Sequence, residues 1–400
     1  MPFKKFILGM IFLTLCGCAA PVPKEGYPSK EPLSFRAKEI SRPLVDDGDK
    51  SSLTRAIEKS LTFTNEKNST ALPTGNSKAT LADFLPPDPI RRSLTLFYEI
   101  LLATPDPEEI DKRVRERFTF WEVTQGGREQ PVLLTGYYEP VFEGSLERGG
   151  DYQFPLYRRP DDLSEFPAGR NSGGKQVGRK ENGQIVSYYS RQEIDEKGVL
   201  QGKGYELAWL KDPWERYVLH VQGSGQVRLP DGRILRVGFA GSNGRAYRSI
   251  GRFLVERGFF AESELSLGRV RAFLKQYPER LAETLSTNER YIFFRFLSTQ
   301  EEGPVGALGV SLTAGRSIAT DFSVFPRGAL AYLIAWEPVF DEQGRWVGKK
   351  MLRRFVLNQD TGAAMKGPCR VDLFMGSGER AGWAAGEMRE EGEIYFLQAK

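Results

Sequence analysis

From residue 132 onward the sequence is a succession of short apolar runs separated by turn-forming residues, and this pattern restricts the chain to a mainly β fold. Runs rich in β-branched and aromatic residues occur at 132–138 and 217–222. Such runs, bounded by glycine, proline, asparagine or aspartate, are typical of strands. Residues 225–237 predict a hairpin that turns at Pro230-Asp231-Gly232. Further strands are expected at residues 329–335, 353–358, 371–374 and 394–398.

The length of the chain predicts more than one domain. Four hundred residues exceed what one ordinary hydrophobic core holds, so we expect two folded domains and tails. A few segments carry apolar residues at helical spacing, and Asp106-Pro107 supplies a helix start signal before one of them. The first two helices are expected to brace the first domain. The expected helices cover residues 90–103, 105–118, 246–258, 263–277 and 278–285.

The first residues resemble a bacterial export signal. Two lysines precede a short apolar run, and Leu15-Cys16-Gly17-Cys18 then resembles a lipobox, in which Cys18 becomes the acylated first residue. Ala19, in place of aspartate, favours the outer membrane. We therefore expect a signal peptide at 1–17 and a Pro-, Ser- and Lys-rich tether at 18–85. The protein is expected in the cell envelope, lipid-anchored to the outer membrane and facing the periplasm.

The cysteine content argues against an internal disulfide, and the net charge argues against nucleic acid binding. After removal of the signal and acylation of Cys18, only Cys369 remains free, so no internal disulfide can form. The net charge of +4 falls to about +2 when the two signal lysines are lost (4 − 2). Nucleic acid binding needs a basic field that this balance does not supply. We expect no nucleic acid partner.

The chain lacks the residues that metal binding, nucleotide binding and serine-hydrolase chemistry require. His220 is the single histidine and no acidic cluster has ligand spacing, so neither a metal nor a cofactor is expected. We expect His220 to be a packed or hydrogen-bonded strand residue. Ser224 lacks the longer nucleophile-elbow pattern. Gly241-Ser-Asn-Gly-Arg lacks the lysine and spacing of a phosphate-binding loop.

Carboxylate chemistry on an uncharged or polymeric substrate remains. Asp360 and Asp372 lie in a glycine-rich stretch that allows tight turns and close approach of the backbone to a ligand. Asp372 belongs to the strand-like run 371–374, which would aim its carboxylate rigidly. The alternative reading makes Asp360 a turn residue and Asp372 a solvated strand residue.

Adjacent tyrosines suit a sugar-binding groove, because aromatic rings pack on the apolar faces of pyranoses. The pairs are Tyr137-Tyr138 and Tyr188-Tyr189. Neighbouring side chains on a strand face opposite ways, so at most one tyrosine of each pair can line a groove. Taken alone, each is also compatible with a core position.

Several motifs, in order, resemble the membrane-bound lytic murein transglycosylase A family. They are Leu133-Leu-Thr-Gly-Tyr-Tyr-Glu-Pro140, Ser190-Arg-Gln-Glu-Ile194, His220-Val-Gln-Gly-Ser-Gly225, Gly241-Ser-Asn-Gly-Arg-Ala-Tyr-Arg-Ser-Ile-Gly251 and Asp360-Thr-Gly through Asp372-Leu-Phe. The last, with Thr320-Asp321-Phe upstream, resembles the 3D domain, named for three aspartates. Ala363 and Met365 stand where the family has glycine and isoleucine, and neither change removes a polar group.

The resemblance implies the architecture and the site. The fold would be a double-psi β-barrel from 86–160 plus 304–400, a smaller β-barrel domain inserted at 161–303, and a groove between them. Asp372 matches the catalytic acid, and Asp360 and Asp321 match supporting aspartates. The expected substrate-binding residues are Tyr137, Tyr138, Ser190, Gln222, Ser224 and Asn243.

The resemblance also implies the reaction, cleavage of the β-1,4 bond between MurNAc and GlcNAc in peptidoglycan. Ordinary glycosidases use two carboxyl groups. The C6 hydroxyl of muramic acid can instead act as nucleophile, so Asp372 alone can protonate the glycosidic oxygen and then take the C6 proton as a 1,6-anhydro ring closes. Asp372 must begin protonated, so we expect its pKa to be raised, and Lys366 would oppose that shift if it lay close.

Two other functions fit the same residues. One is a hydrolase in which Asp360 and Asp372 share acid and base work with water, and the other is a lipoprotein that binds peptidoglycan without cutting it. The expected partners are peptidoglycan glycan strands, the membrane through Cys18, and envelope protein complexes.

Overall fold

The computed structural model describes residues 33–65, 81, 85–125, 128–167, 175–298 and 303–400. These residues belong to one compact unit that spans 31–400. None of the helices in these ranges is long and apolar enough to cross a membrane. The predicted signal peptide at 1–17 and the predicted lipidation site Cys18 lie outside the described residues.

The larger sheet closes into a barrel. Its strands run in the order β1-β2-β18-β15-β16-β14-β17-β4, and β4 also pairs with β18, so six strands from β18 to β4 form a ring. Two pairings in this ring, β14 with β16 and β17 with β4, are parallel. The bounds are β1 (Leu33–Ala37), β2 (Phe118–Gln125), β3 (Arg128–Glu129), β4 (Val132–Glu139), β14 (Ser317–Ala319), β15 (Leu330–Phe340), β16 (Trp346–Asp360), β17 (Arg370–Ser377) and β18 (Arg389–Ala399).

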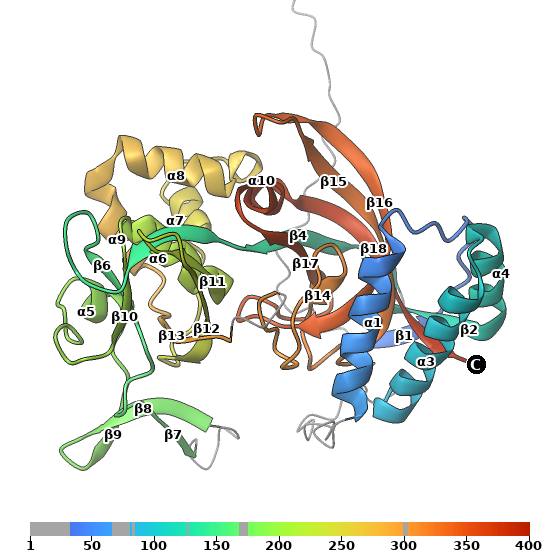
Figure 1. The fold of residues 1–400 in the computed structure, drawn as a ribbon, viewed down its shortest axis with the longest axis horizontal. Helices are drawn as coiled ribbons and strands as arrows, with labels where there is room; N and C mark the ends of the chain where they lie inside the picture. Colours follow the sequence, from blue (N-terminus) through green and yellow to red (C-terminus); the bar gives the residue numbers. More distant parts are fainter. Residues whose placement is uncertain (1–32, 66–80, 82–84, 126–127, 168–174, 299–302) are drawn as a thin grey trace, which may run out of the picture. The chain divides into compact units, whose positions relative to one another are not determined.

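Helices cover the barrel, as Figure 1 shows for α1 and α3 beside β16 and β18. The helices of this part are α1 (Lys50–Asn65), α3 (Pro87–Ala103), α4 (Pro107–Arg117) and α10 (Glu379–Glu387). The helices expected at 90–103 and 105–118 are therefore confirmed. Asp106 begins α4 by accepting a hydrogen bond from the Glu108 N–H, as its start signal predicts. Phe97 of α3 packs on Phe355 of β16, with ring centroids 4.7 Å apart.

The tether predicted for residues 18–85 is wrong for residues 33–65, which are part of the folded body. Strand β1 pairs with β2, and Leu53 and Ile57 of α1 are buried in the barrel's hydrophobic core. Arg316, 1% exposed, donates to both carboxylate oxygens of Asp46 at 2.7 and 2.8 Å. The average composition of the segment conceals the helical spacing of its few apolar residues.

The second part of the chain is a smaller β domain. Its six strands run in the order β13-β12-β11-β5-β10-β6, and a bridge between Arg158 and Phe294 joins the two ends of the sheet. The strands are β5 (Val141–Ser145), β6 (Phe154–Tyr157), β10 (Glu206–Leu210), β11 (Ser224–Arg228), β12 (Ile234–Ser242) and β13 (Ile292–Phe296). The pairing of β11 with β12 confirms the predicted hairpin. Together the two sheets confirm a mainly β fold in which a double-psi β-barrel carries a smaller inserted β domain.

Further elements surround this second sheet. A separate sheet is formed by β7 (Ser164–Pro167), β8 (Lys175–Glu181) and β9 (Gln184–Ser187). The helices are α5 (Arg191–Asp195), α6 (Pro213–Gln222), α7 (Ile250–Glu256), η1 (Glu262–Glu264), α8 (Leu267–Gln276), η2 (Pro278–Arg280) and α9 (Leu281–Ser286). The helices expected at 246–258, 263–277 and 278–285 correspond to α7, α8 and the pair η2 and α9.

The strand predicted at 217–222 is wrong, because these residues form the end of α6. Asp212 accepts a hydrogen bond from a backbone N–H of the first turn, and Pro213 occupies the first helical position. Gly223 ends the helix in the left-handed region, with φ +81°. The local start and stop signals therefore override the β propensity of the residues between them.

The first domain boundary, predicted near residue 160, lies at Pro140. Strand β4 belongs to the barrel, whereas β5 and β6 pair with strands of the second sheet. Glu139, the last residue of β4, is fully buried and lies 2.8 Å from Arg236 of β12. Its carboxylate also accepts hydrogen bonds from Gln226 at 2.8 Å and from Ser377 of β17 at 2.6 Å. One buried carboxylate therefore connects the two sheets where the chain passes from one to the other.

Candidate active site

A groove of about 720 Å³ lies between residues of the two sheets. The barrel contributes residues of β4 and β17 and the loop that follows β16, and the second domain contributes the end of α6 and residues of β11, β12 and β13. Asp360 and Asp372 are the two carboxylates among the lining residues. The predicted groove is thus present, and it holds two of the three expected aspartates.

The alternation of β17 brings Asp372 to the groove. Val371 and Leu373 are fully buried, so the side chains of Arg370 and Asp372 lie on the other face of the strand. Asp372 stands opposite Thr135 of the parallel strand β4, and the Thr135 hydroxyl donates a hydrogen bond to its carboxylate. The Asp372 side chain is only 18% exposed, and Arg370 Nε lies 3.6 Å from its Oδ1.

Burial raises the pKa of Asp372 above its usual value, and the positive charge of Arg370 opposes that shift. The cation beside Asp372 is therefore Arg370, whereas Lys366 is exposed. The expected raised pKa agrees in direction with this environment.

Asp360 is held by more donors than Asp372. It ends β16, and its Oδ1 accepts hydrogen bonds from the backbone N–H groups of Ala307 at 2.8 Å and Thr361 at 2.9 Å. Its Oδ2 accepts one from the Tyr137 hydroxyl at 3.0 Å. Burial nonetheless raises the pKa of Asp360 to about 6, against the effect of these hydrogen bonds and with a smaller contribution from the charge of Asp372. The two carboxyl groups are electrostatically linked but differ in their partners.

Asp321 lies outside the groove and organises the loop between the other two aspartates. One carboxylate oxygen accepts hydrogen bonds from the N–H of Ser323 at 3.0 Å and from its hydroxyl at 2.7 Å. The other accepts one from the N–H of Gly367 at 2.7 Å, and Gly367 adopts φ +78°, which favours glycine. Asp321 therefore fixes the turn that precedes β17.

One tyrosine of the pair on β4 faces the groove. Tyr137 lines it and packs on Phe374, with ring centroids 5.3 Å apart. The Tyr138 ring lies against Gly382 of α10, and its backbone N–H donates to Gln222 at 3.1 Å. Neither Tyr188 nor Tyr189 lines the groove. The alternation expected along the strand explains this division.

Of the remaining predicted binding residues, two line the groove and two lie outside it. Gln222 and Ser224 line the groove. Ser190 lies outside it and caps α5 in a reciprocal arrangement with Glu193. Asn243, 1% exposed, donates to two backbone carbonyls and accepts from the Tyr291 N–H at 2.9 Å, so its amide stabilises its own loop. The structure therefore gives Ser190 and Asn243 structural contacts outside the groove.

His220 contributes a neutral side chain to the groove wall. It is 5% exposed, and its Nδ1 lies 2.8 Å from Arg191 Nη1. Its ring packs against Tyr291 and Phe294, at centroid distances of 4.2 and 5.5 Å. Burial and the nearby arginine charges lower the pKa of His220 well below its usual value. These contacts agree with the packed residue expected from the sequence, although on a helix.

Sequence reasoning missed four residues of the groove. Arg370 is only two residues from Asp372 on the same strand. Because alternate residues of a strand share a face, the sequence could have predicted that the two side chains lie close together. Phe239, 52% exposed, presents an aromatic ring to the groove from β12. Arg290 and Arg295 approach from the segment around β13 and carry no motif that separates them from the chain's other arginines.

Among the described residues, no group of three histidine, cysteine, aspartate or glutamate side chains is placed to hold a metal ion.

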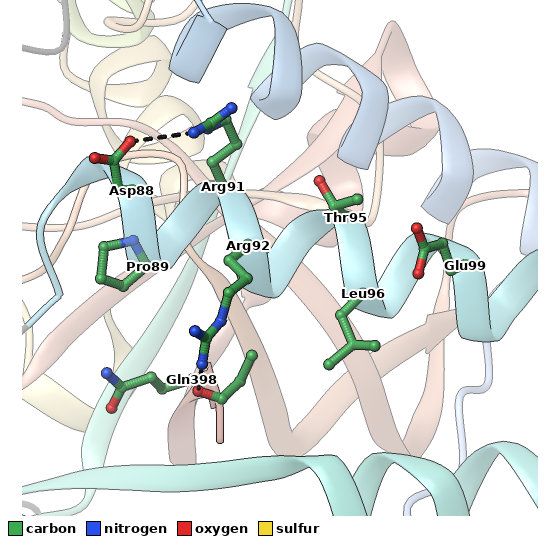
Figure 2. Close-up of a pocket in the computed structure, with 9 residues that line it drawn as sticks. Asp88, Pro89, Arg91, Arg92, Thr95, Leu96, Glu99 and Gln398 are labelled. Atoms are coloured by element: carbon green, nitrogen blue, oxygen red, sulfur yellow. Dashed lines mark hydrogen bonds and ion pairs between the residues drawn. The ribbon is translucent and has the colours of Figure 1, made fainter.

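A second hollow, of about 800 Å³, lies beside α3 and the end of β18. Figure 2 shows its charged side chains engaged locally, with Arg91 paired to Asp88 and Arg92 directed to the C-terminal backbone. These contacts hold the helix to the chain end. The groove with the two buried aspartates is the stronger candidate for chemistry.

Comparison with known proteins identifies relatives of this chain. Residues 133–295 match the MltA specific insert domain, and residues 316–398 match the 3D domain. The chain is 32% identical over 281 residues to membrane-bound lytic murein transglycosylase A of Escherichia coli K12, covering 70% of this chain and 68% of the relative. The corresponding Vibrio cholerae protein is 30% identical over 275 residues, with 68% and 67% covered.

Solved structures agree with this relationship. The fold resembles a membrane-bound lytic murein transglycosylase of Agrobacterium tumefaciens with a TM-score of 0.72 and 26% identity, over 92% of this chain and 98% of that one. It also resembles Escherichia coli MltA with bound chitohexaose, with a TM-score of 0.64 and 27% identity, over 92% and 95% of the two chains.

Replacement of Asp360 by asparagine should make stability less dependent on pH. The folded-state pKa of about 6 lies above the unfolded value of 3.8, so the wild-type protein loses stability as the pH rises from about 4 to about 6. The loss is at most about 3 kcal/mol, since each pH unit between the two values corresponds to about 1.4 kcal/mol. Urea unfolding at pH 4.5 and 7 should measure this change. The free energy of unfolding of Asp360→Asn, relative to that of wild type, should be higher at pH 7 than at pH 4.5.

The matched control is Asp231→Asn, because hydrogen bonds from Arg233 hold the pKa of that exposed carboxyl below its usual value. The unfolded value of 3.8 and the lower folded value both lie below pH 4.5, so Asp231→Asn should differ from wild type by nearly the same amount at the two pH values. A difference between Asp360→Asn and wild type that does not change with pH would contradict the raised pKa.

Proposed function

Because the chain belongs to the membrane-bound lytic murein transglycosylase A family, we propose that it cleaves the β-1,4 bond between MurNAc and GlcNAc in peptidoglycan and forms a 1,6-anhydromuramoyl end. One observation carries the assignment of its acid. Asp372 lies in the groove at 18% exposure, and burial raises its pKa. A raised pKa favours the protonated carboxyl group that the first step of the reaction needs.

The proposed reaction uses Asp372 twice. Its carboxyl group protonates the glycosidic oxygen as the bond to C1 breaks, and the resulting carboxylate takes the proton of the C6 hydroxyl as that oxygen closes the anhydro ring on C1. Proton and electron balance need no second carboxylate and no water. Asp360 is proposed as a supporting group, because its two backbone donors and Tyr137 occupy both its oxygens.

Arg370 is proposed to balance the two protonation states of Asp372. Its positive charge favours the carboxylate, which forms when the first proton is donated. Burial alone would favour the acid and resist that ionisation. The pairing therefore keeps the group convertible between acid and base.

The groove also offers contacts for sugar rings. Tyr137 and the exposed ring of Phe239 provide aromatic faces, and Gln222 and Ser224 provide hydrogen-bonding groups. The Escherichia coli relative was crystallised with chitohexaose. We propose that these four residues contact the glycan strand, and that Asp321 supports the site from outside the groove.

Asp372→Asn should reduce solubilisation of sacculi by about 10³-fold, because it removes the acid and the base at once. Wild-type digests should contain 1,6-anhydromuramoyl ends by mass spectrometry, with no oxygen incorporated from labelled water. Asp341→Asn, on an exposed hairpin turn, is the matched control and should leave activity unchanged. Labelled reducing ends from wild type would assign a hydrolase, and activity retained by Asp372→Asn would move the acid elsewhere.

Arg370→Gln should move the alkaline limb of the pH profile of kcat/KM to higher pH. The variant removes the charge that lowers the pKa of Asp372, so the carboxyl group stays protonated to higher pH. Lys366→Gln changes an exposed cation of the same segment and should not move the limb. An unchanged limb in Arg370→Gln would remove Arg370 from this role, and partial restoration in Arg370→Lys would support it.

We further propose that the protein is lipid-anchored through Cys18 in the outer membrane and faces the periplasm. The lipobox-like Leu15-Cys16-Gly17-Cys18 and Ala19 support this location. Incorporation of labelled palmitate should be lost in Cys18→Ser, whereas Cys16→Ser should retain it. Envelope fractionation should recover the wild type with the outer membrane, and recovery with the inner membrane would correct the sorting assignment.

A further inference from the structure

Two arginines of the groove have no acidic partner within the described part of the chain. Arg290 and Arg295 line it from the second domain, on the segment around β13. In the described residues, the one side-chain hydrogen bond of Arg290 reaches the backbone carbonyl of Arg245 at 3.4 Å, and Arg295 has no ion pair. Among the lining residues that the structure describes, the only carboxylates are Asp360 and Asp372, and both belong to the barrel. This wall of the groove is therefore positive.

Several other arginines of this domain have acidic partners. Arg236 lies 2.8 Å from Glu139, Arg216 lies 3.0 Å from Asp195, and Arg245 lies 3.3 Å from Glu289. Arg290 is half-buried, and burial lowers its pKa because its charge has lost water without gaining an anion. A charged group left in this state at a groove wall is suited to an anionic ligand.

The substrate of the proposed reaction supplies such anions. We propose that Arg290 and Arg295 bind a carboxylate carried by the muramic acid residues of the glycan strand. The lactyl ether of muramic acid ends in a carboxylate when it is free and bears the carboxylates of a stem peptide when it is substituted. A guanidinium group pairs with either through parallel hydrogen bonds. GlcNAc carries no charge, so these contacts would distinguish muramyl strands from neutral oligosaccharides of the same backbone.

The inference rests on the proposed function, but its test uses binding alone and does not depend on turnover. Affinity would be measured in the Asp372→Asn background for three probes: peptide-substituted glycan strands, strands freed of peptide that keep their lactyl carboxylates, and neutral chitohexaose. The double variant Arg290→Gln and Arg295→Gln should bind muramyl strands about fivefold to tenfold more weakly, as expected for two partly exposed ion pairs. Its affinity for chitohexaose should stay within about twofold.

The matched control is Arg228→Gln, since Arg228 is exposed on β11 and lies outside the groove. It should leave all three affinities unchanged. Raising the salt concentration should weaken muramyl binding of the parent protein and have less effect on the double variant. Arg290→Lys with Arg295→Lys keeps the charges and should restore part of the affinity.

The three probes separate the sources of the anion. Weaker binding of peptide-substituted strands alone assigns the contacts to the stem peptide, and weaker binding of both muramyl probes assigns them to the lactyl carboxylate. Equal loss for chitohexaose, or no loss for any probe, would overturn the inference. Retained chitohexaose binding also establishes that the double variant keeps a folded groove.

Discussion

The parallel pairing of β17 with β4 is the constraint on which the groove depends. It sets Asp372 opposite Thr135 and Phe374 opposite Tyr137, so the proposed acid, its hydroxyl partner and the tyrosine that holds Asp360 follow from one register. A shift of one residue would turn Asp372 into the barrel core. The same strand β4 then passes through Pro140 into the second sheet, where the buried Glu139 meets Arg236. One strand therefore positions residues on both walls.

The two carboxyl groups that share the groove differ in their hydrogen-bond partners. Asp360 receives donors on both oxygens, whereas Asp372 has a hydroxyl group and a cation beside it. Both pKa values are raised by burial, but the partners of Asp360 are fixed backbone and ring groups. Oδ2 of Asp372 accepts no hydrogen bond from the described residues, so this oxygen is available to exchange a proton with a ligand. Arg290 and Arg295 belong to the other wall of the groove, and their proposed role is in strand selection.

Much of the fold was predictable because its signals are local. Strand alternation correctly separated Tyr137 from Tyr138. Apolar residues at helical spacing located α3, and the start signal at Asp106-Pro107 located α4. The segment at 217–222 was misread because β-branched residues outweighed the start signal at Asp212-Pro213. Ser190 and Asn243 belong to motifs that resemble those of the family, yet their polar atoms serve a helix cap and a loop. Phe239, Arg290 and Arg295 reach the groove only through the pairing of β12 with β13, and this contact leaves no trace in a single sequence.

The early start of the folded body would limit the reach of the molecule if it is anchored as proposed. Strand β1 begins at Leu33, so a lipid on Cys18 would leave fourteen residues, 19–32, between the bilayer and the first strand. Fully extended, fourteen residues span at most about 50 Å. An enzyme with so short a connection to its lipid would reach the layer of cell wall next to its own membrane, and more distant layers would lie beyond its reach.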